Sequence, residues 1–301
     1  MTTTSPANRT SAAQPARAEQ PRPGRARGMP GWAWWVICGL IGIMFLAPVA
    51  LLLSTVFKTP EAAVQSPPDY LPSQPSAENF SDLGSTGSGV WRYIANTLVV
   101  SLGTVGLSVV VSTLAGYGFA HFRVPFGGVL FGTVLLSIMI PFQAILPSLY
   151  KLLQFLSLQN SLLGLILVYA TFQMPLSVFL MRNSFAQVPV SLVEAAEIDG
   201  CSSLGALRRV MLPVVRPGMI SVALFAFFSS WNEFLAALVL LSNDDKFTLP
   251  IFLTSIATGR LGAIEWGVLE AGVLVTMVPC VLIFLLLQRY YVRGIVAGSL
   301  K

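Results

Sequence analysis

The chain has 301 residues, of which 54% are hydrophobic and only 10% are charged, and its mean hydropathy is +0.74. Water-soluble domains carry about 25% charged residues, so this composition excludes an ordinary soluble protein. The formal charge of +5 would suggest nucleic-acid binding in a soluble chain, but here the basic residues lie between long apolar runs. We therefore expect an all-α polytopic membrane protein, surrounded by membrane lipid and without a nucleic-acid partner.

Residues 1–31 form a tail of a different composition. This tail holds five arginines, five prolines and one acid, with almost no bulky apolar side chain. Such a segment cannot bury enough surface to offset the entropy of the chain. We expect the tail to be disordered and residues 32–301 to form the membrane domain.

Six apolar runs are long enough to cross a bilayer, which takes about 20 residues in a helix. The first run, residues 32–57, exceeds the apolar core of a cleavable signal peptide, which is about 7–15 residues long. The other five are residues 93–121, 126–150, 161–181, 217–241 and 266–287. Residues 58–92 are rich in Pro, Ser and Gly, which predicts an exposed extracellular loop.

The orientation of the spans follows from the bias of Lys and Arg toward cytoplasmic segments. With the amino terminus inside the cell, thirteen of the 18 Lys and Arg residues lie on the inner side and five on the outer side. The reverse topology would invert this ratio. The sequence therefore predicts that both termini are cytoplasmic.

Two of the spans carry polar or small residues that need an explanation. In the second span, small side chains recur every four residues and predict either a helix-packing surface or a ligand groove: Thr104, Ser108, Ser112, Gly116 and Ala120. In the third span, Pro141 and Pro147 favour kinks, and Gln143 lies between them at membrane depth. Gln143 either lines a pathway or bonds to carbonyl groups that the prolines free.

Glu233 is an ionisable residue in the outer half of the fifth span. Such a residue must face protein or water and not lipid. It is the leading intramembrane candidate for function, although a purely structural hydrogen bond to a neighbouring helix would explain it equally well. Glu270, near the outer end of the sixth span, fits an interfacial structural role better.

The longest inner loop, residues 182–217, has signals for two short helices. Ser191 and Glu194 have the spacing of a capping box, and Gly200 suits the left-handed turn that ends a helix. Ser202 or Ser203 can cap a second short helix that would end at Pro213. The small residues Ala195 and Ala196, flanked by acids, leave room for a partner with basic groups.

The spacing Glu194-Ala195-Ala196, three residues, Gly200, nine residues, Val210, one residue, Leu212-Pro213 resembles the EAA loop of ABC importer permeases. The chain departs from the family pattern only in having Val210 in place of Ile. The resemblance covers about residues 32–301. It implies a MetI-like permease fold of six transmembrane helices with a cytoplasmic coupling helix.

The same resemblance implies the partners of the chain. A cytoplasmic ABC ATPase dimer would bind the EAA loop through Glu194, Ala195, Ala196, Asp199, Gly200, Leu212 and Pro213. ATP and Mg would be held by that ATPase, since none of the four lysines of this chain completes a phosphate-binding loop. A second homologous permease subunit and an extracellular solute-binding protein complete the expected importer in the bacterial inner membrane.

Weaker features resemble the carbohydrate branch of the family, the maltose-permease MalG-like subunits. They are the paired prolines, the segment around Glu233 and the carboxy-terminal residues 293–298. A sugar offers hydroxyl groups and needs no charged partner. The expected substrate pathway, for a di- or oligosaccharide, therefore includes the polar and aromatic residues Gln143, Gln173, Trp231, Asn232 and Glu233.

Two other functions remain as alternatives. An ion-coupled secondary transporter would use the carboxylates of Glu233 and Glu270 to bind protons or cations. An intramembrane enzyme has little support, because the single histidine, His121, lies at a helix end without a cluster of metal ligands around it. The sequence thus favours a non-catalytic membrane subunit.

Overall fold

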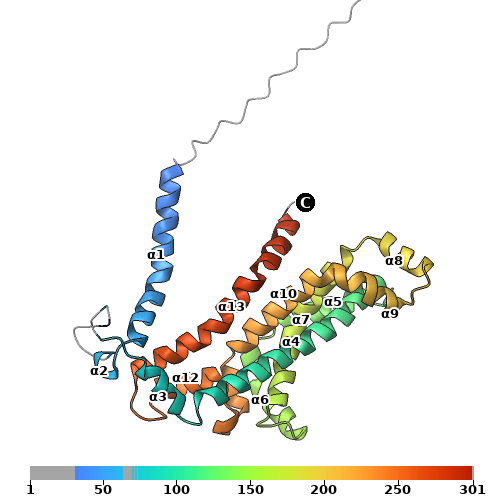
Figure 1. Cartoon of the computed structure of the whole chain (residues 1–301). Coiled ribbons are helices and arrows are strands. Elements are labelled where there is room, and N and C mark those ends of the chain that lie inside the picture. Colours follow the sequence, from blue (N-terminus) through green and yellow to red (C-terminus); the bar gives the residue numbers. More distant parts are fainter. Residues whose placement is uncertain (1–30, 64–69, 71, 73, 300–301) are drawn as a thin grey trace, which may run out of the picture. The chain divides into compact units, whose positions relative to one another are not determined.

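The computed structural model describes residues 31–63, 70, 72 and 74–299, and within these residues every regular element is a helix (Figure 1). Of the predicted disordered tail, only its last residue, Gly31, lies in this part of the chain. The chain divides within the first helix, at Pro48, into two units. The second unit starts at Val49 and contains all the other helices.

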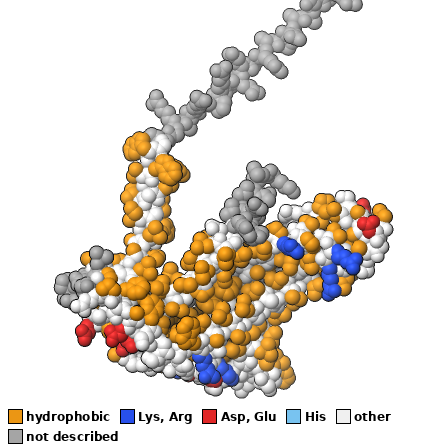
Figure 2. Space-filling model, in the orientation of Figure 1, with side chains coloured by type: hydrophobic (Ala, Val, Ile, Leu, Met, Phe, Trp, Pro, Cys, Tyr) orange, Lys and Arg blue, Asp and Glu red, His pale blue; other side chains and the backbone are white. Residues whose placement is uncertain are grey.

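Five helical segments are long and apolar enough to cross a membrane. They agree with five of the six predicted spans and are α1 (Gly31–Val56), α4 (Val90–His121), α7 (Leu162–Ala186), the segment Ser203–Trp231 and α13 (Trp266–Ser299). Large apolar side chains on their surfaces are exposed, and Figure 2 shows hydrophobic side chains over much of the visible face of the second unit. This surface fits a lipid environment, and the prediction of an all-α polytopic fold is confirmed.

The third predicted span, residues 126–150, is not one straight helix. It consists of α5 (Gly127–Leu136), a 3-10 turn (Ser137–Met139) and α6 (Phe142–Phe155), with a bend of 102° at the break. Pro141 stands immediately before α6 in an extended conformation, because proline cannot supply the amide that would continue the preceding helix. If the bent pair counts as one span, the described chain has six spans.

The fifth span begins earlier than its predicted range of 217–241. The helix is continuous from α9 (Ser203–Ala206) through a π-helical turn (Leu207–Met211) into α10 (Leu212–Trp231). The prediction that the second short helix ends at Pro213 is therefore wrong. Pro213 lies in the first turn of α10, directly after the π-helical turn.

Helices α4, α7 and α10 pack against one another and form the centre of the second unit (Figure 1). The predicted stripe on α4 faces this contact, since Thr104, Ser108, Ser112 and Gly116 are all buried. A Cβ atom on Gly116 would lie 2.6 Å from Cβ of Met181 and 2.8 Å from the backbone nitrogen of Arg182. The stripe thus lets the backbones of α4 and α7 approach closely, as expected of small residues in membrane helices.

Part of the segment predicted as an exposed loop, residues 58–92, is instead packed structure. It contains α2 (Pro60–Ala63) and α3 (Glu78–Ser85), and α3 packs against α13. Asn79 is fully buried, and its Nδ2 donates to the carbonyl oxygens of Val56 at 2.9 Å and Lys58 at 2.8 Å. Hydrophobic runs do not reveal α3, because a helix of eight residues is too short to resemble a span.

The connection between the last two spans is fastened to the start of α4. This connection contains α11 (Leu235–Leu240), a 3-10 turn (Asp244–Lys246) and α12 (Leu249–Ala257). The hydroxyl of Tyr93 donates to Asp244 at 2.8 Å, and Nδ2 of Asn96 donates to the carbonyl of Asp245 at 2.9 Å. These bonds attach the connection to α4. They lie at the end of the helix bundle that is far from α8 (Val190–Ile198) (Figure 1).

The close contact at Gly116 gives a testable prediction. We expect Gly116→Ala to lower the Tm of the full chain in detergent by about 2–6 °C, because overpacking costs about 1–3 kcal/mol. Gly118→Ala is the matched control, since nothing lies within 4 Å of its added Cβ atom and alanine favours a helix. Equal Tm values for the two variants would contradict the proposed packing contact.

Candidate functional site

The first part of the candidate site is helix α8, which carries the Glu194-Ala195-Ala196 motif. The helix ends as predicted at Gly200, whose φ of +81° lies in the left-handed region. The amide of Cys201 donates to the carbonyl of Ala196 at 2.9 Å, which is the bond of a Schellman motif. Gly200 therefore sets the direction in which the chain leaves α8.

The start of α8 differs from the prediction, while the cap of the next helix agrees with it. Helix α8 begins at Val190, so Ser191 lies inside the first turn and is not the capping residue. The hydroxyl of Ser202 accepts a hydrogen bond from the amide of Gly205 at 3.3 Å and caps α9. The predicted capping box is wrong, and the predicted cap at Ser202 is confirmed.

The two alanines of the motif lie on different faces of α8. Ala196 is only 5% exposed, whereas Glu194, Ala195 and Asp199 are exposed, and Ile198 is 86% exposed. Successive residues of an α-helix point about 100° apart, so one alanine can pack inward while its neighbour faces out. The outward face, defined by Glu194, Ala195 and Ile198, combines a small residue, an apolar side chain and an acid.

The inner side of α8 rests on an apolar cluster shared by the main helices. Val193 of α8 packs against this cluster, and the hydroxyl of Tyr117 donates to the carbonyl of Ser203 at 3.3 Å. The buried members of the α8 base cluster are Tyr117, Met181, Phe185, Val188, Leu207, Met211, Val215 and Val222. Because all of them except Val188 belong to α4, α7 and the 203–231 segment, a movement of α8 would act on all three.

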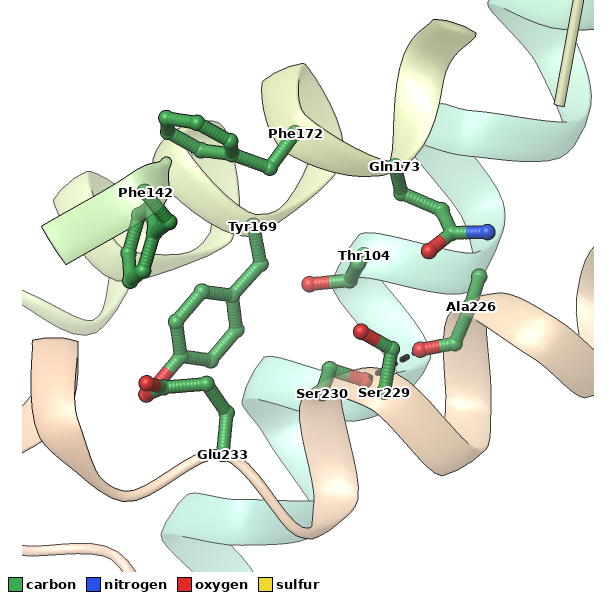
Figure 3. A pocket seen from close by; sticks show the side chains of 9 residues that line it. All are labelled: Thr104, Phe142, Tyr169, Phe172, Gln173, Ala226, Ser229, Ser230 and Glu233. Carbon is green, nitrogen blue, oxygen red and sulfur yellow. Dashed lines mark hydrogen bonds between the residues drawn. The ribbon is translucent and has the colours of Figure 1, made fainter. Parts of the chain in front are cut away.

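The second part of the candidate site is a cavity of about 210 Å³ in the middle of the helices (Figure 3). Four elements and the residue Glu233 contribute to it: α4, α6, α7 and α10. Its lining consists of aromatic, hydroxyl, carboxamide and carboxylate side chains, from Thr104, Phe142, Tyr169, Phe172, Gln173, Ala226, Ser229, Ser230 and Glu233. We call this space the central cavity.

Glu233 is held in place at the edge of the central cavity. Its Oε1 accepts from the amide of Ala236 at 2.8 Å, and its Oε2 accepts from the amide of Ala237 at 3.2 Å and from the hydroxyl of Tyr169. Three donors thus converge on the two oxygens of this carboxyl group. Glu233 thus caps the start of α11 and ties it to α7.

The predicted pathway residues do not all meet in one place. Gln173 and Glu233 line the central cavity, whereas Gln143 lines a separate groove of about 630 Å³ beside α11. Trp231 is fully buried, and its Nε1 donates to the carbonyl of Thr276 at 3.1 Å. Asn232 is exposed outside the cavity lining and donates to the carbonyl of Phe228 at 2.9 Å.

Several cavity residues were not selected from the sequence. Tyr169 lies four residues before Gln173, so the two share one face of α7, and this spacing could have revealed it. Phe142 and Phe172 carry no such signal, because phenylalanine is common in every apolar run.

The bonds of Glu233 give a second prediction. We expect Glu233→Ala to speed amide hydrogen exchange at Ala236 and Ala237 about tenfold, because loss of a helix cap costs about 1–2 kcal/mol. Glu265→Ala, which removes an exposed carboxylate just before α13, is the control. Unchanged exchange in α11 of the Glu233 variant would show that the cap has no local effect.

Comparison with known proteins places these features in a family. Residues 108–296 match the family model described as "Binding-protein-dependent transport system inner membrane component". The diacetylchitobiose uptake system permease protein DasC of Streptomyces coelicolor is 31% identical, over 87% of this chain and 93% of its own length. The arabinooligosaccharides transport system permease protein AraQ of Halalkalibacterium halodurans is also 31% identical, over 90% of this chain and 98% of its own.

A solved structure has the same fold. A chain of a bacterial ABC transporter involved in the import of the acidic polysaccharide alginate matches with a TM-score of 0.77 and 21% identity, over 90% of this chain and all of that one. The family match covers more than half of the chain and includes helix α8 and most of the central cavity. The chain belongs to the family of inner membrane components of binding-protein-dependent transport systems.

Proposed function

We propose that this chain is a membrane subunit of an ATP-driven importer that takes up an oligosaccharide. The observation that carries the proposal is helix α8, whose motif matches the EAA loop and whose small and apolar outward face has no cover from the described part of the chain. The family description and the names of the two relatives, which transport diacetylchitobiose and arabinooligosaccharides, support it.

In this proposal, a cytoplasmic ATPase dimer binds the outward face of α8 and supplies the energy. Exposed Ala195 permits close approach, Ile198 fits an apolar groove of the ATPase, and Glu194 and Asp199 pair with basic groups there. Gly200, Leu212 and Pro213 fix the path of the chain from α8 into α10. ATP and Mg are bound by the ATPase, and this chain catalyses no reaction itself.

The same proposal fixes the orientation and the remaining partners. Both termini lie in the cytoplasm, α8 faces the cytoplasm, and the α3 end faces the outside of the inner membrane. A solute-binding protein delivers the sugar on that outer side, and a second permease subunit completes the pathway. The distribution of Lys and Arg supports this orientation.

The sugar pathway in this proposal uses the predicted residues to different extents. Gln173 and Glu233 can reach a ligand in the central cavity, and Gln143 can reach one in the neighbouring groove. Trp231 and Asn232 bond to backbone carbonyls of the chain. In this structure they therefore position the end of α10.

Helix α8 provides the direct test. We expect Ala195→Trp to reduce sugar uptake by cells with the complete transporter at least tenfold and to prevent copurification of the ATPase. The fold of this chain should stay intact, because the side chain is exposed. Ala195→Ser, which keeps a small side chain, is the matched control and should retain uptake and ATPase binding.

Deletion of the ATPase gene separates this function from ion-coupled transport. An importer driven by ATP loses uptake entirely when the ATPase is absent. Uptake that persisted without the ATPase and collapsed with the ion gradient would refute the proposal and favour a secondary transporter.

A further inference from the structure

We propose that the central cavity is a binding subsite for one uncharged sugar ring and that it rejects rings carrying a carboxylate. The proposal rests on the importer function above and assigns part of the substrate recognition to this subunit. Three observations support it: unpaired buried polar groups, an aromatic wall, and a fixed carboxylate without a cation beside it.

Two polar side chains in the central cavity are buried without a partner. Thr104 is 1% exposed and Gln173 is 9% exposed, and neither the Thr104 hydroxyl nor the Gln173 Nε2 has a hydrogen-bond partner in the described structure. Figure 3 shows the Thr104 hydroxyl pointing into the space beside the Tyr169 ring. An unpaired buried polar group costs about 1–3 kcal/mol, so a ligand that bonds both groups would be stabilised.

The size and walls of the cavity fit a single ring. Its volume of about 210 Å³ lies below the roughly 300–1,000 Å³ of pockets for drug-sized ligands, which favours one monosaccharide unit over a longer chain. Phe142 and Phe172 form an edge-to-face pair with ring centroids 4.3 Å apart. Together with Tyr169 they offer apolar surface to the carbon-bound hydrogens of a sugar ring.

The charge in the cavity opposes acidic sugars. Glu233 contributes a carboxylate whose position is fixed by Tyr169 and by the amides of Ala236 and Ala237. The lining residues that the structure describes include no Lys or Arg. A uronic acid would therefore bring a second carboxyl group next to Glu233 without a cation to pair with it, which is unfavourable.

Water molecules are the other possible occupant, and the two cases predict opposite results. If the unpaired groups await a sugar, replacing them by apolar side chains of similar shape removes a cost from the empty protein. If ordered water already satisfies them, the same replacements remove favourable hydrogen bonds. The stability of the empty chain therefore distinguishes a sugar site from a hydrated space.

The test uses the full chain purified in detergent, with thermal unfolding as the readout. The probes are two neutral disaccharides, diacetylchitobiose and arabinobiose, and one acidic disaccharide, digalacturonate, each at millimolar concentration. We expect at least one neutral probe to raise the Tm and digalacturonate to leave it unchanged. Thr104→Val and Gln173→Leu should each raise the Tm of the empty chain by about 2–4 °C and weaken binding of the neutral probe at least fivefold.

Thr171→Val is the matched control. Thr171 lies on α7 near Gln173 but is exposed, and its hydroxyl already donates to the carbonyl of Leu167 at 2.7 Å. This variant should bind the neutral probe as the unaltered chain does. The proposal is overturned if neither neutral probe shifts the Tm, if digalacturonate shifts it equally, or if the cavity variants lower the Tm and keep their affinity.

The outcome can be separated from that of the importer proposal. Uptake that depends on the ATPase and fails in Ala195→Trp, but is normal in Thr104→Val and Gln173→Leu, would leave the importer function standing and refute the sugar subsite. Uptake independent of the ATPase would refute the importer function whatever the cavity binds.

Discussion

The close contact between α4 and α7 is the constraint on which the rest of the second unit depends. Small residues on α4 let the two backbones meet at Gly116. The same helix pair contributes Thr104, Tyr169 and Gln173 to the central cavity. Tyr117 of α4 belongs to the α8 base cluster. It lies thirteen residues after Thr104, which is about 20 Å along the helix axis. One rigid pair of helices therefore connects the ligand-sized space with the surface proposed to bind the ATPase.

Glu233 combines a structural role with the proposed role in ligand selection. A carboxylate at this depth must be compensated, and here an O–H group and two amides do so at the start of α11. These three bonds hold the carboxyl group in one position in the structure. A preorganised group of this kind can discriminate between ligands without a reorganisation cost.

The architecture could be predicted from the sequence to the extent that it depends on long apolar runs. Hydropathy reveals the length of an apolar run, so the straight spans could be located. It does not reveal the direction of the helix axis, and the only sign in the sequence of the 102° bend before α6 is Pro141. The early start of the fifth span was missed because Pro213 was interpreted as a stop. A proline in a helical pattern either ends the helix or lies within a helix that continues, and the local sequence does not distinguish the two cases.

The site was predictable where a residue is unusual for its surroundings. Gly200 predicted the turn that ends α8, and Gln173 and Glu233 were conspicuous as polar residues in apolar runs. The sequence did not reveal that Ala196 is buried while Ala195 is exposed, because this depends on which side of α8 packs against the other helices. The capping box failed because the helix starts at Val190, directly after Pro189 and before Ser191.

The π-helical turn at Leu207–Met211 has a consequence for the motif itself. A π turn holds one residue more than an α turn, and each residue of a helix advances its azimuth by about 100°. A deletion or insertion between Ser203 and Leu212, inside the continuous helix, would therefore rotate the outward face of α8 around the axis of α10 by about that angle. The number of residues in this stretch therefore determines the direction in which the outward face of α8 points.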